Sequence, residues 1–118
     1  MTMAPEEVSE DDSLSLSDIR IEGPALVVRS GGGRSGETFG LKGDRLTVGR
    51  SPECDVFLDD VTVSRQHAII TRSDGGFTID DEGSLNGTYV NRRRVETATL
   101  EDGDEVQIGK YRLTFLTG

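Results

Sequence analysis

The chain has 118 residues, 33% of them hydrophobic, and a net charge of −9. This length suits one domain with a single core. Because an acidic chain lacks the positive charge that holds a nucleic-acid backbone and is repelled by anionic lipid, we expect neither nucleic acid nor a membrane as partner.

The cellular compartment is indicated by three features of the sequence. No apolar run approaches the ~20 residues of a spanning helix. The N-terminus lacks the basic and apolar regions of a secretory signal. The single cysteine, Cys54, has no internal partner for a disulfide, which suits a reducing compartment. We therefore expect a cytoplasmic protein.

Residues 1–24 differ in composition from the rest of the chain. They carry a net charge of −6 and few large apolar side chains, so they cannot bury enough surface to offset the entropy of ordering. We expect an acidic disordered tail, followed by one domain over residues 25–118. The alternation of serine and leucine over residues 13–17 leaves open a short strand or a partner-docking segment.

From residue 25 onward, short runs rich in β-branched residues alternate with Gly, Asp and Asn turn signals. No stretch sustains a helical period for three turns. The pattern predicts an all-β fold, a β-sandwich of two mainly antiparallel sheets. The predicted strands cover residues 25–28, 37–41, 45–48, 56–58, 67–71, 77–79, 88–90, 95–100, 105–108 and 111–116.

Three segments in the connections between predicted strands contain side chains that suit phosphate binding. A phosphothreonine carries roughly −1.5 to −2 charges and three acceptor oxygens. Arg50 can hold such a group bidentately, Ser64 offers a hydroxyl donor, and Arg65 adds a second cation. An Asn86 carboxamide can pair with the backbone of an extended peptide. The segments are Gly49-Arg50-Ser51, Ser64-Arg65-Gln66-His67 and Asn86-Gly87-Thr88-Tyr89-Val90-Asn91.

Groups that would break a bond are not evident in the sequence. There is no clear nucleophile–base pair and no pair of catalytic carboxylates. His67 is the only histidine, so no multi-histidine metal site can form around it. The acidic run Asp80-Asp81-Glu82 lacks the ligand spacing of a calcium loop, and we interpret it as a solvated loop. We expect no enzymatic activity, no metal and no cofactor.

In this order and spacing, the three segments resemble the signature of the forkhead-associated (FHA) domain, a phosphothreonine-peptide reader with a β-sandwich fold. The resemblance covers residues 25–118 and implies that the binding loops cluster at one end of the sandwich. It implies phosphate contacts from Arg50 and Ser64, a further contact from Arg65 and a peptide-backbone contact from Asn86.

The resemblance also divides the remaining motif residues between two roles. Thr88 and Asn91 are placed with the peptide-binding set, and Asn91 has a second interpretation as a tie between loops. Structural roles in shaping the loops fall to Gly49, His67 and Gly87. Where many FHA domains continue with glycine, this chain has Arg92-Arg93-Arg94. We interpret the triplet either as a solvated turn or as cations that recruit acidic residues flanking the phosphothreonine.

Two stretches, residues 57–65 and 104–110, resemble one FHA subgroup in particular. These are the small actinobacterial regulators of glycogen accumulation and of oxoglutarate dehydrogenase. The resemblance implies phosphothreonine-dependent binding of Ser/Thr protein kinases. It also implies phosphate-independent binding of enzymes such as oxoglutarate dehydrogenase or glutamate dehydrogenase.

Two functions therefore remain open at the level of sequence. One is a phosphothreonine-binding signalling module, and the alternative is a phosphate-independent inhibitor of a metabolic enzyme through the same loop surface. The subgroup also switches itself off when a phosphorylated tail threonine occupies its own FHA site. The tail of this chain contains a single threonine, Thr2, together with several serines.

Overall fold

The structure is a computed structural model, and it describes residues 23–118. The acidic tail was predicted over residues 1–24, and its residues 1–22 lie outside the described residues. The described chain forms eleven strands: β1 (Ala25–Ser30), β2 (Thr38–Gly40), β3 (Arg45–Gly49), β4 (Val56–Phe57), β5 (Ala68–Ser73), β6 (Gly76–Asp81), β7 (Thr88–Val90), β8 (Arg93–Val95), β9 (Thr97–Leu100), β10 (Glu105–Ile108) and β11 (Tyr111–Leu116).

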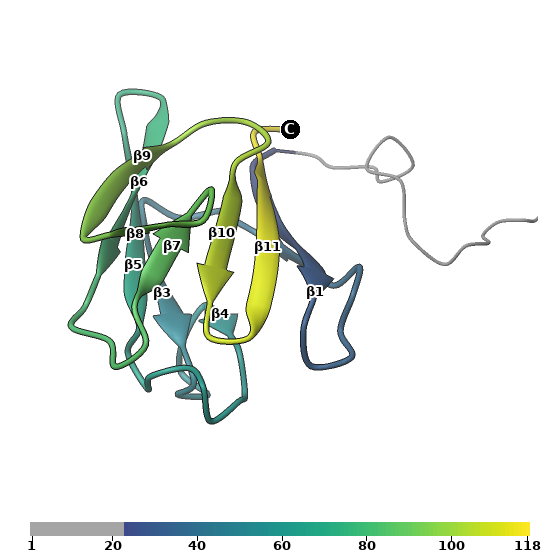
Figure 1. Ribbon diagram of the computed structural model, residues 1–118. Helices are drawn as coiled ribbons and strands as arrows, with labels where there is room; N and C mark the ends of the chain where they lie inside the picture. The colour runs from purple at the N-terminus through teal and green to yellow at the C-terminus, as the bar shows by residue number, and fades with distance from the viewer. Residues whose placement is uncertain (1–22) are drawn as a thin grey trace, which may run out of the picture.

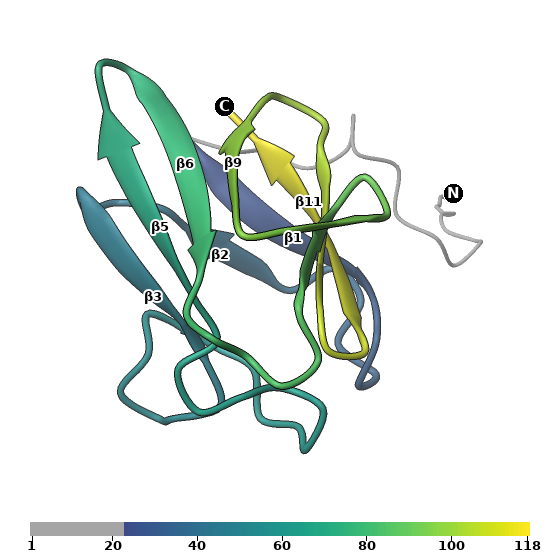
Figure 2. The same cartoon turned by 60° about the vertical axis from the view of Figure 1, so that its left-hand side comes forward.

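The strands form two sheets that face each other, as Figures 1 and 2 show. One sheet has the order β2-β1-β11-β10-β7-β8, and the other has the order β4-β3-β5-β6-β9. Every pairing is antiparallel except that of β3 with β4. The predicted sandwich of two mainly antiparallel sheets is thereby confirmed.

The core lies between the sheets because alternate residues of each strand point inward. Leu26, Val106 and Leu113 come from the first sheet, Ile70 and Ile79 from the second, and all five are at most 1% exposed. Phe115 and Phe77 meet edge to face across the core, with ring centroids 5.4 Å apart. The contact joins the two sheets through interior strands, β11 of the first and β6 of the second.

One predicted strand, residues 95–100, is in fact parts of two strands that belong to different sheets. β8 ends at Val95 beside β7, and β9 begins at Thr97 beside β6. The sequence pattern missed this break because Glu96 is neither glycine nor proline. The chain crosses from one sheet to the other at that residue.

The β7–β8 connection is a two-residue turn made by Asn91 and Arg92. Both have positive φ, 51° and 71°, and Val90 pairs with Arg93 across the turn. Two successive left-handed residues in a two-residue hairpin loop are typical of a type I′ turn. The turn therefore keeps the geometry that an Asn-Gly sequence favours, although arginine stands in the second position.

Candidate functional site

Three connections converge at one end of the sandwich, the lower end in Figures 1 and 2. They join β3 to β4, β4 to β5 and β6 to β7. The predicted contacts Arg50, Ser64, Arg65 and Asn86 all lie in these connections, although they are distant in sequence. The sandwich topology brings them together because β3, β5 and β6 are neighbours in one sheet and β7 begins at the same end of the other.

Arg50 follows the last residue of β3 and is held by the connection that contains Ser64. Its backbone N–H donates to Ser64 O at 3.0 Å, and its Nε donates to Val63 O at 3.1 Å. The second bond fixes the plane of the half-buried guanidinium group. The two terminal nitrogens keep their donors for an acceptor outside the domain, in the fork geometry that suits a phosphate.

Ser64 is half-buried beside Arg50, and its hydroxyl oxygen accepts a hydrogen bond from the N–H of Leu85 at 3.0 Å. A serine hydroxyl has one proton to donate and two lone pairs. Because the bond to Leu85 uses a lone pair, the proton remains available for a phosphate oxygen. Arg65 is exposed, and its carbonyl accepts from the N–H of Ser51 at 3.2 Å, which ties this segment to the β3–β4 connection.

His67 is fully buried behind the site, at 0% exposed. Its Nδ1 accepts from the N–H of Ser64 at 3.0 Å. Its Nε2 lies 2.9 Å from Gly87 O, and a carbonyl only accepts, so Nε2 carries the proton. The ring thus clamps two loops together, and neither nitrogen is free to act as a base or a metal ligand. This arrangement supports the structural role that the resemblance implied.

Gly49 is required because another part of the backbone approaches its α-carbon closely. A Cβ atom at this residue would lie 2.2 Å from Arg65 O and 3.0 Å from Cys54 Sγ. Such contacts are far inside van der Waals distance, so the backbones of β3 and the β4–β5 connection would have to separate. Gly49 therefore sets how closely Arg50 and Ser64 approach each other.

The β6–β7 connection is organised by Asp81, which corrects our interpretation of residues 80–82 as a solvated loop. Asp81 Oδ1 accepts from the hydroxyls of Ser84 and Thr88, and Oδ2 accepts from the N–H of Ser84. Partial burial of Asp81 would raise its pKa, but the hydrogen bonds from Ser84 and Thr88 outweigh burial and lower the pKa below its ordinary value of 3.8. The sequence signal that marks this role is the spacing Asp81-x-x-Ser84, typical of a side chain that closes its own turn.

Thr88 is placed under the loop instead of on the binding surface. It is 0% exposed, and its hydroxyl donates to Asp81 Oδ1 at 2.7 Å. A buried side chain with its hydroxyl engaged offers no surface to a peptide. Contrary to the expected peptide contact, the geometry places Thr88 with the residues that support the site.

Asn86 and Gly87 form the tip of the β6–β7 connection. Asn86 is exposed, and its Nδ2 donates to Thr62 O at 2.9 Å. The second amide hydrogen and the carboxamide oxygen remain for the backbone of a bound peptide. Gly87 has a φ of +88°, a conformation that strongly favours glycine, and its carbonyl is the acceptor for His67.

Asn91 lies at the other end of β7, in the β7–β8 turn, and not among the converging loops. Its side chain donates to Asp104 Oδ1 at 3.0 Å and accepts from the N–H of Glu105 at 2.9 Å. Both partners belong to the beginning of β10 and the turn before it. Of the two interpretations open from the sequence, this geometry favours the tie between loops.

A second feature missed by the sequence pattern is the Asp60–Thr62 turn in the β4–β5 connection. Asp60 Oδ2 accepts from both the hydroxyl and the N–H of Thr62, and Lys110 Nζ lies 3.1 Å from Asp60 Oδ1. The hydrogen bonds from Thr62, followed by that from Lys110, lower the pKa of Asp60 to about 2. The turn connects the site to the β10–β11 hairpin.

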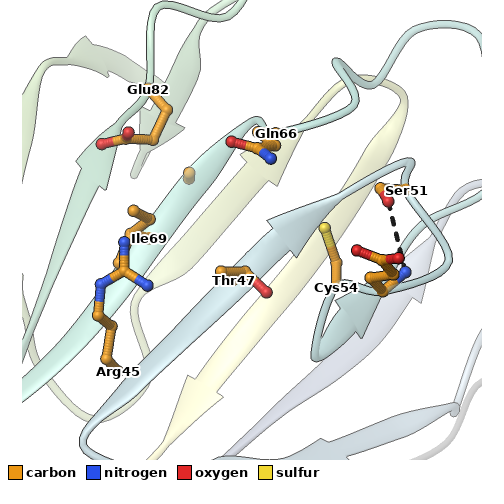
Figure 3. A pocket seen from close by; sticks show the side chains of 9 residues that line it. Arg45, Thr47, Ser51, Cys54, Gln66, Ile69 and Glu82 are labelled. Atoms are coloured by element: carbon orange, nitrogen blue, oxygen red, sulfur yellow. Dashed lines mark hydrogen bonds between the residues drawn. The ribbon is translucent and has the colours of Figure 1, made fainter.

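A separate hollow of about 270 Å³ lies on the outer face of the second sheet, next to the β3–β4 connection (Figure 3). Its lining mixes charges, with Arg45 opposite Glu82 in Figure 3, and it includes Glu53, whose backbone N–H donates to Ser51 Oγ at 3.4 Å. None of the predicted phosphopeptide contacts lines it. The hollow is therefore distinct from the loop site.

Residues 23–118 were also searched for metal-binding groups and for membrane-spanning helices. No group of three or more His, Cys, Asp or Glu side chains is arranged there so that it could hold a metal ion. No helix in this part of the chain is long and apolar enough to cross a membrane.

Comparison with known proteins identifies the family. A family model described as FHA domain matches residues 46–109, more than half of the chain. The chain belongs to the FHA domain family. The matched residues include the converging loops of the site and confirm the resemblance predicted from the three segments.

This FHA protein is also similar to named regulators along most of its length. It is 49% identical over 115 residues to the glycogen accumulation regulator GarA of Mycolicibacterium smegmatis, a match that covers 98% of this chain and 73% of the relative. It is 53% identical over 96 residues to the oxoglutarate dehydrogenase inhibitor of Corynebacterium diphtheriae, covering 81% of this chain and 67% of the relative.

Among solved structures, it is similar to Mycobacterium tuberculosis EmbR in complex with a low-affinity phosphopeptide. The TM-score is 0.75 with 28% identity, and the match covers 88% of this chain and 27% of EmbR. The similarity to named relatives thus supports the predicted subgroup, and the similarity to solved structures supports the predicted fold.

Proposed function

We propose that residues 25–118 form a phosphothreonine-peptide-binding module that acts in the cytoplasm downstream of Ser/Thr protein kinases. Its partners are phosphothreonine-containing proteins, kinases among them, and it regulates enzymes of central metabolism. We assign it no catalytic activity. The membership of the FHA family and the similarity to GarA and to the oxoglutarate dehydrogenase inhibitor support this proposal.

The observation that carries the proposal is the set of unused donors at the converging loops. The side chain of Arg50 is anchored through Nε alone, and the hydroxyl of Ser64 is anchored through a lone pair. A phosphate bound from water must exchange strong hydration for rigid, charge-assisted hydrogen bonds. The loops offer such donors already oriented, so little ordering is required on binding.

Replacement of Arg50 by alanine tests the site. Loss of a charge-assisted fork under a bound phosphate should weaken binding by on the order of 2–5 kcal/mol. Binding of a phosphothreonine peptide is measured by fluorescence anisotropy, with the unphosphorylated peptide as reference. Arg72→Gln is the matched control, because Arg72 lies on β5 and stacks on Phe77 at 5.3 Å, away from the loops.

An unchanged affinity of Arg50→Ala would reject the site. If Arg72→Gln also bound the phosphothreonine peptide more weakly, any loss of positive charge would lower the affinity. Circular dichroism of each variant separates loss of contact from loss of fold.

A specific observation favours the alternative function as a phosphate-independent inhibitor. Val61 and Leu85 are 90% and 84% exposed, and they are the large hydrophobic residues on the surface of the described domain. They lie in the β4–β5 and β6–β7 connections, beside Ser64 and Asn86. Exposed apolar side chains grouped at one end of a domain are typical of a protein–protein contact.

One experiment, capture of unphosphorylated partner enzymes by the domain, distinguishes the two functions. Oxoglutarate dehydrogenase, suggested by the name of the corynebacterial relative, and glutamate dehydrogenase are the first partners to test. If the alternative holds, Val61→Ser with Leu85→Ser abolishes their capture, while Arg50→Ala has a smaller effect. Capture that requires phosphate and Arg50 in every case would reject the alternative.

A further inference from the structure

An open groove leads away from the phosphate end of the site over the outer face of the first sheet. Thr62 and Asn86 form its near end, and Tyr89, Gln107, Lys110 and Arg92 continue it. Thr62 and Asn86 are also joined by the hydrogen bond that shapes the site. A peptide held at Arg50 and Asn86 therefore has a continuous surface for its flanking residues.

Two residues that line the groove, Gln107 and Tyr89, belong to a row of residues set by the strand register, and Arg112 and Arg94 extend that row on either side of the groove. Arg112 pairs with Gln107, Gln107 with Tyr89, and Tyr89 with Arg94. Their neighbours Val106 and Ile108 point into the core, so this row of four faces outward because side chains alternate along a strand. Arg94 also approaches the site itself, since a Cβ atom on Gly87 would lie 2.7 Å from Arg94 Nε.

The groove and its border carry exposed positive charge although residues 25–118 have a net charge of −3. Arg92 Nε is 3.5 Å from Glu105 Oε2, and its side chain is still 69% exposed. Lys110 is balanced by Asp60 at 3.1 Å. Within residues 23–118, no acidic side chain lies within ion-pair distance of Arg94 or Arg112. Around the groove, the positive charge without an acidic partner in the described part of the chain is therefore that of Arg94 and Arg112 at its border, with the exposed end of Arg92; of these, Arg94 lies next to Gly87 and Arg92 lines the groove.

We propose that this groove binds acidic residues that flank the phosphothreonine in a partner, with Arg92 and Arg94 as the determinants of that preference. The inference rests on the proposed function, because the phosphate contact places the flank over the groove. Carboxylates match the arginine forks in geometry and charge, and the phenol of Tyr89 adds a neutral donor.

The test compares phosphothreonine peptides that differ only in the flank. One carries three aspartates before the phosphothreonine, a second carries them after it, and the reference has asparagines at all these positions. Two exposed ion pairs predict that the wild-type domain binds one of the acidic peptides about fivefold more tightly than the reference. The preference should shrink when salt is raised from about 0.05 M to about 0.5 M.

The variant Arg92→Gln with Arg94→Gln should lose the preference and keep its affinity for the reference peptide. Arg93→Gln is the matched control, because Arg93 pairs with the inward-facing Val90 and lies on the opposite face of β8. We expect it to retain the preference. Thermal melting of each variant reports on the fold.

The outcomes distinguish this inference from the function on which it rests. If the wild type binds all three phosphopeptides equally, or if the double variant keeps the acidic preference, the groove has no such role and the phosphate site stands. If Arg93→Gln loses the preference to the same extent, the effect is one of net charge and the assignment to Arg92 and Arg94 is wrong. If no phosphothreonine peptide binds the wild type, the proposed function itself fails.

Discussion

Arg50 and Ser64 are each held in place through one part of the side chain, while the other part remains available. The Nε of Arg50 is bonded to Val63 O, and the oxygen of Ser64 accepts from Leu85. These anchors come from backbone groups, which are fixed by the strands on either side. The result is a pair of donors with little rotational freedom, as recognition of a phosphate requires.

Ser64→Ala should weaken phosphopeptide binding about tenfold or more, because one hydrogen bond to a charged group contributes roughly 1.5–3 kcal/mol. It also leaves the N–H of Leu85 without its acceptor. Isothermal titration with a phosphothreonine peptide measures the change. The companion variant Ser64→Thr keeps the hydroxyl and should bind more tightly than Ser64→Ala; equal affinities of the two would argue against the hydroxyl contact.

Arg92 is strained at the residue level, since it has a φ of 71° in the β7–β8 turn. A left-handed conformation costs a residue with a Cβ on the order of 1 kcal/mol. Arg92→Gly should therefore raise the free energy of unfolding by about 0.5 kcal/mol, after loss of the exposed ion pair with Glu105. Urea unfolding checks this. The control Arg93→Gly, in the extended β8, should instead lower the free energy of unfolding. A loss of stability in Arg92→Gly would contradict the assignment of the turn.

The β6–β7 connection behaves as a structural element of its own, built around Asp81. One carboxylate holds Ser84 and Thr88, while His67 holds the carbonyl of Gly87 from behind. The loop that carries Asn86 is thus held from within by Asp81 and His67, while Asn86 itself is exposed. Its rigidity depends on Asp81 remaining ionised.

The sign of the resulting pH dependence follows from the lowered pKa values of Asp81 and Asp60. A carboxyl whose pKa is lower in the folded protein than in the unfolded chain stabilises the fold above its unfolded pKa, near 3.8. This stabilisation is lost as the pH falls through the folded value, which for Asp60 is about 2. We expect stability to decline from about pH 4 towards about pH 2.

Asp81→Asn should remove part of that decline and should destabilise the domain by roughly 1–3 kcal/mol near neutral pH, since two hydroxyls lose their carboxylate acceptor. Urea unfolding midpoints across the acid range measure both effects. Asp74→Asn, in the exposed β5–β6 turn, serves as the charge-matched control. An unaltered acid profile in Asp81→Asn would assign the decline to other carboxyls.

At the scale of the whole molecule, the loops depend on a core that joins two sheets. Phe115 of β11 is 0% exposed and meets Phe77 of β6 edge to face. The contact sets the spacing of the sheets, and with it the approach of the β6–β7 connection from one sheet to β7 in the other. Gly118 lies against Gly23 at the end of the sandwich opposite the site (Figure 1).

Phe115→Ala should lower the free energy of unfolding by about 3–5 kcal/mol, because it removes a buried ring and leaves a cavity. Chemical denaturation monitored by circular dichroism measures the loss. Leu116→Ala, at the partly exposed neighbouring position, should cost much less. Similar losses in the two variants would contradict the assigned register of β11.

Much of the fold was predictable from the sequence because the strand signals are local. Alternating apolar residues and Asn, Asp and Gly turns indicate where β10 and β11 begin and end, and both predicted ranges agree with the structure. The crossing at Glu96 was not predictable, because no residue there disfavours an extended chain. The role of Asp81 is signalled only by its spacing to Ser84, which is a weak signal because an acidic residue at the end of a strand is usually solvated.

The sequence alone determined the family, the class of fold and the residues at the tips of the loops, because those depend on residue types at short spacings. Only the tertiary structure decided that Thr88 is buried, that Gly49 is required by a neighbouring backbone, and that Asn91 lies outside the loop site. These properties depend on which strands are adjacent and on how closely their connections approach. Adjacency of that kind is set by the packing of the whole sandwich and is not encoded in any one segment.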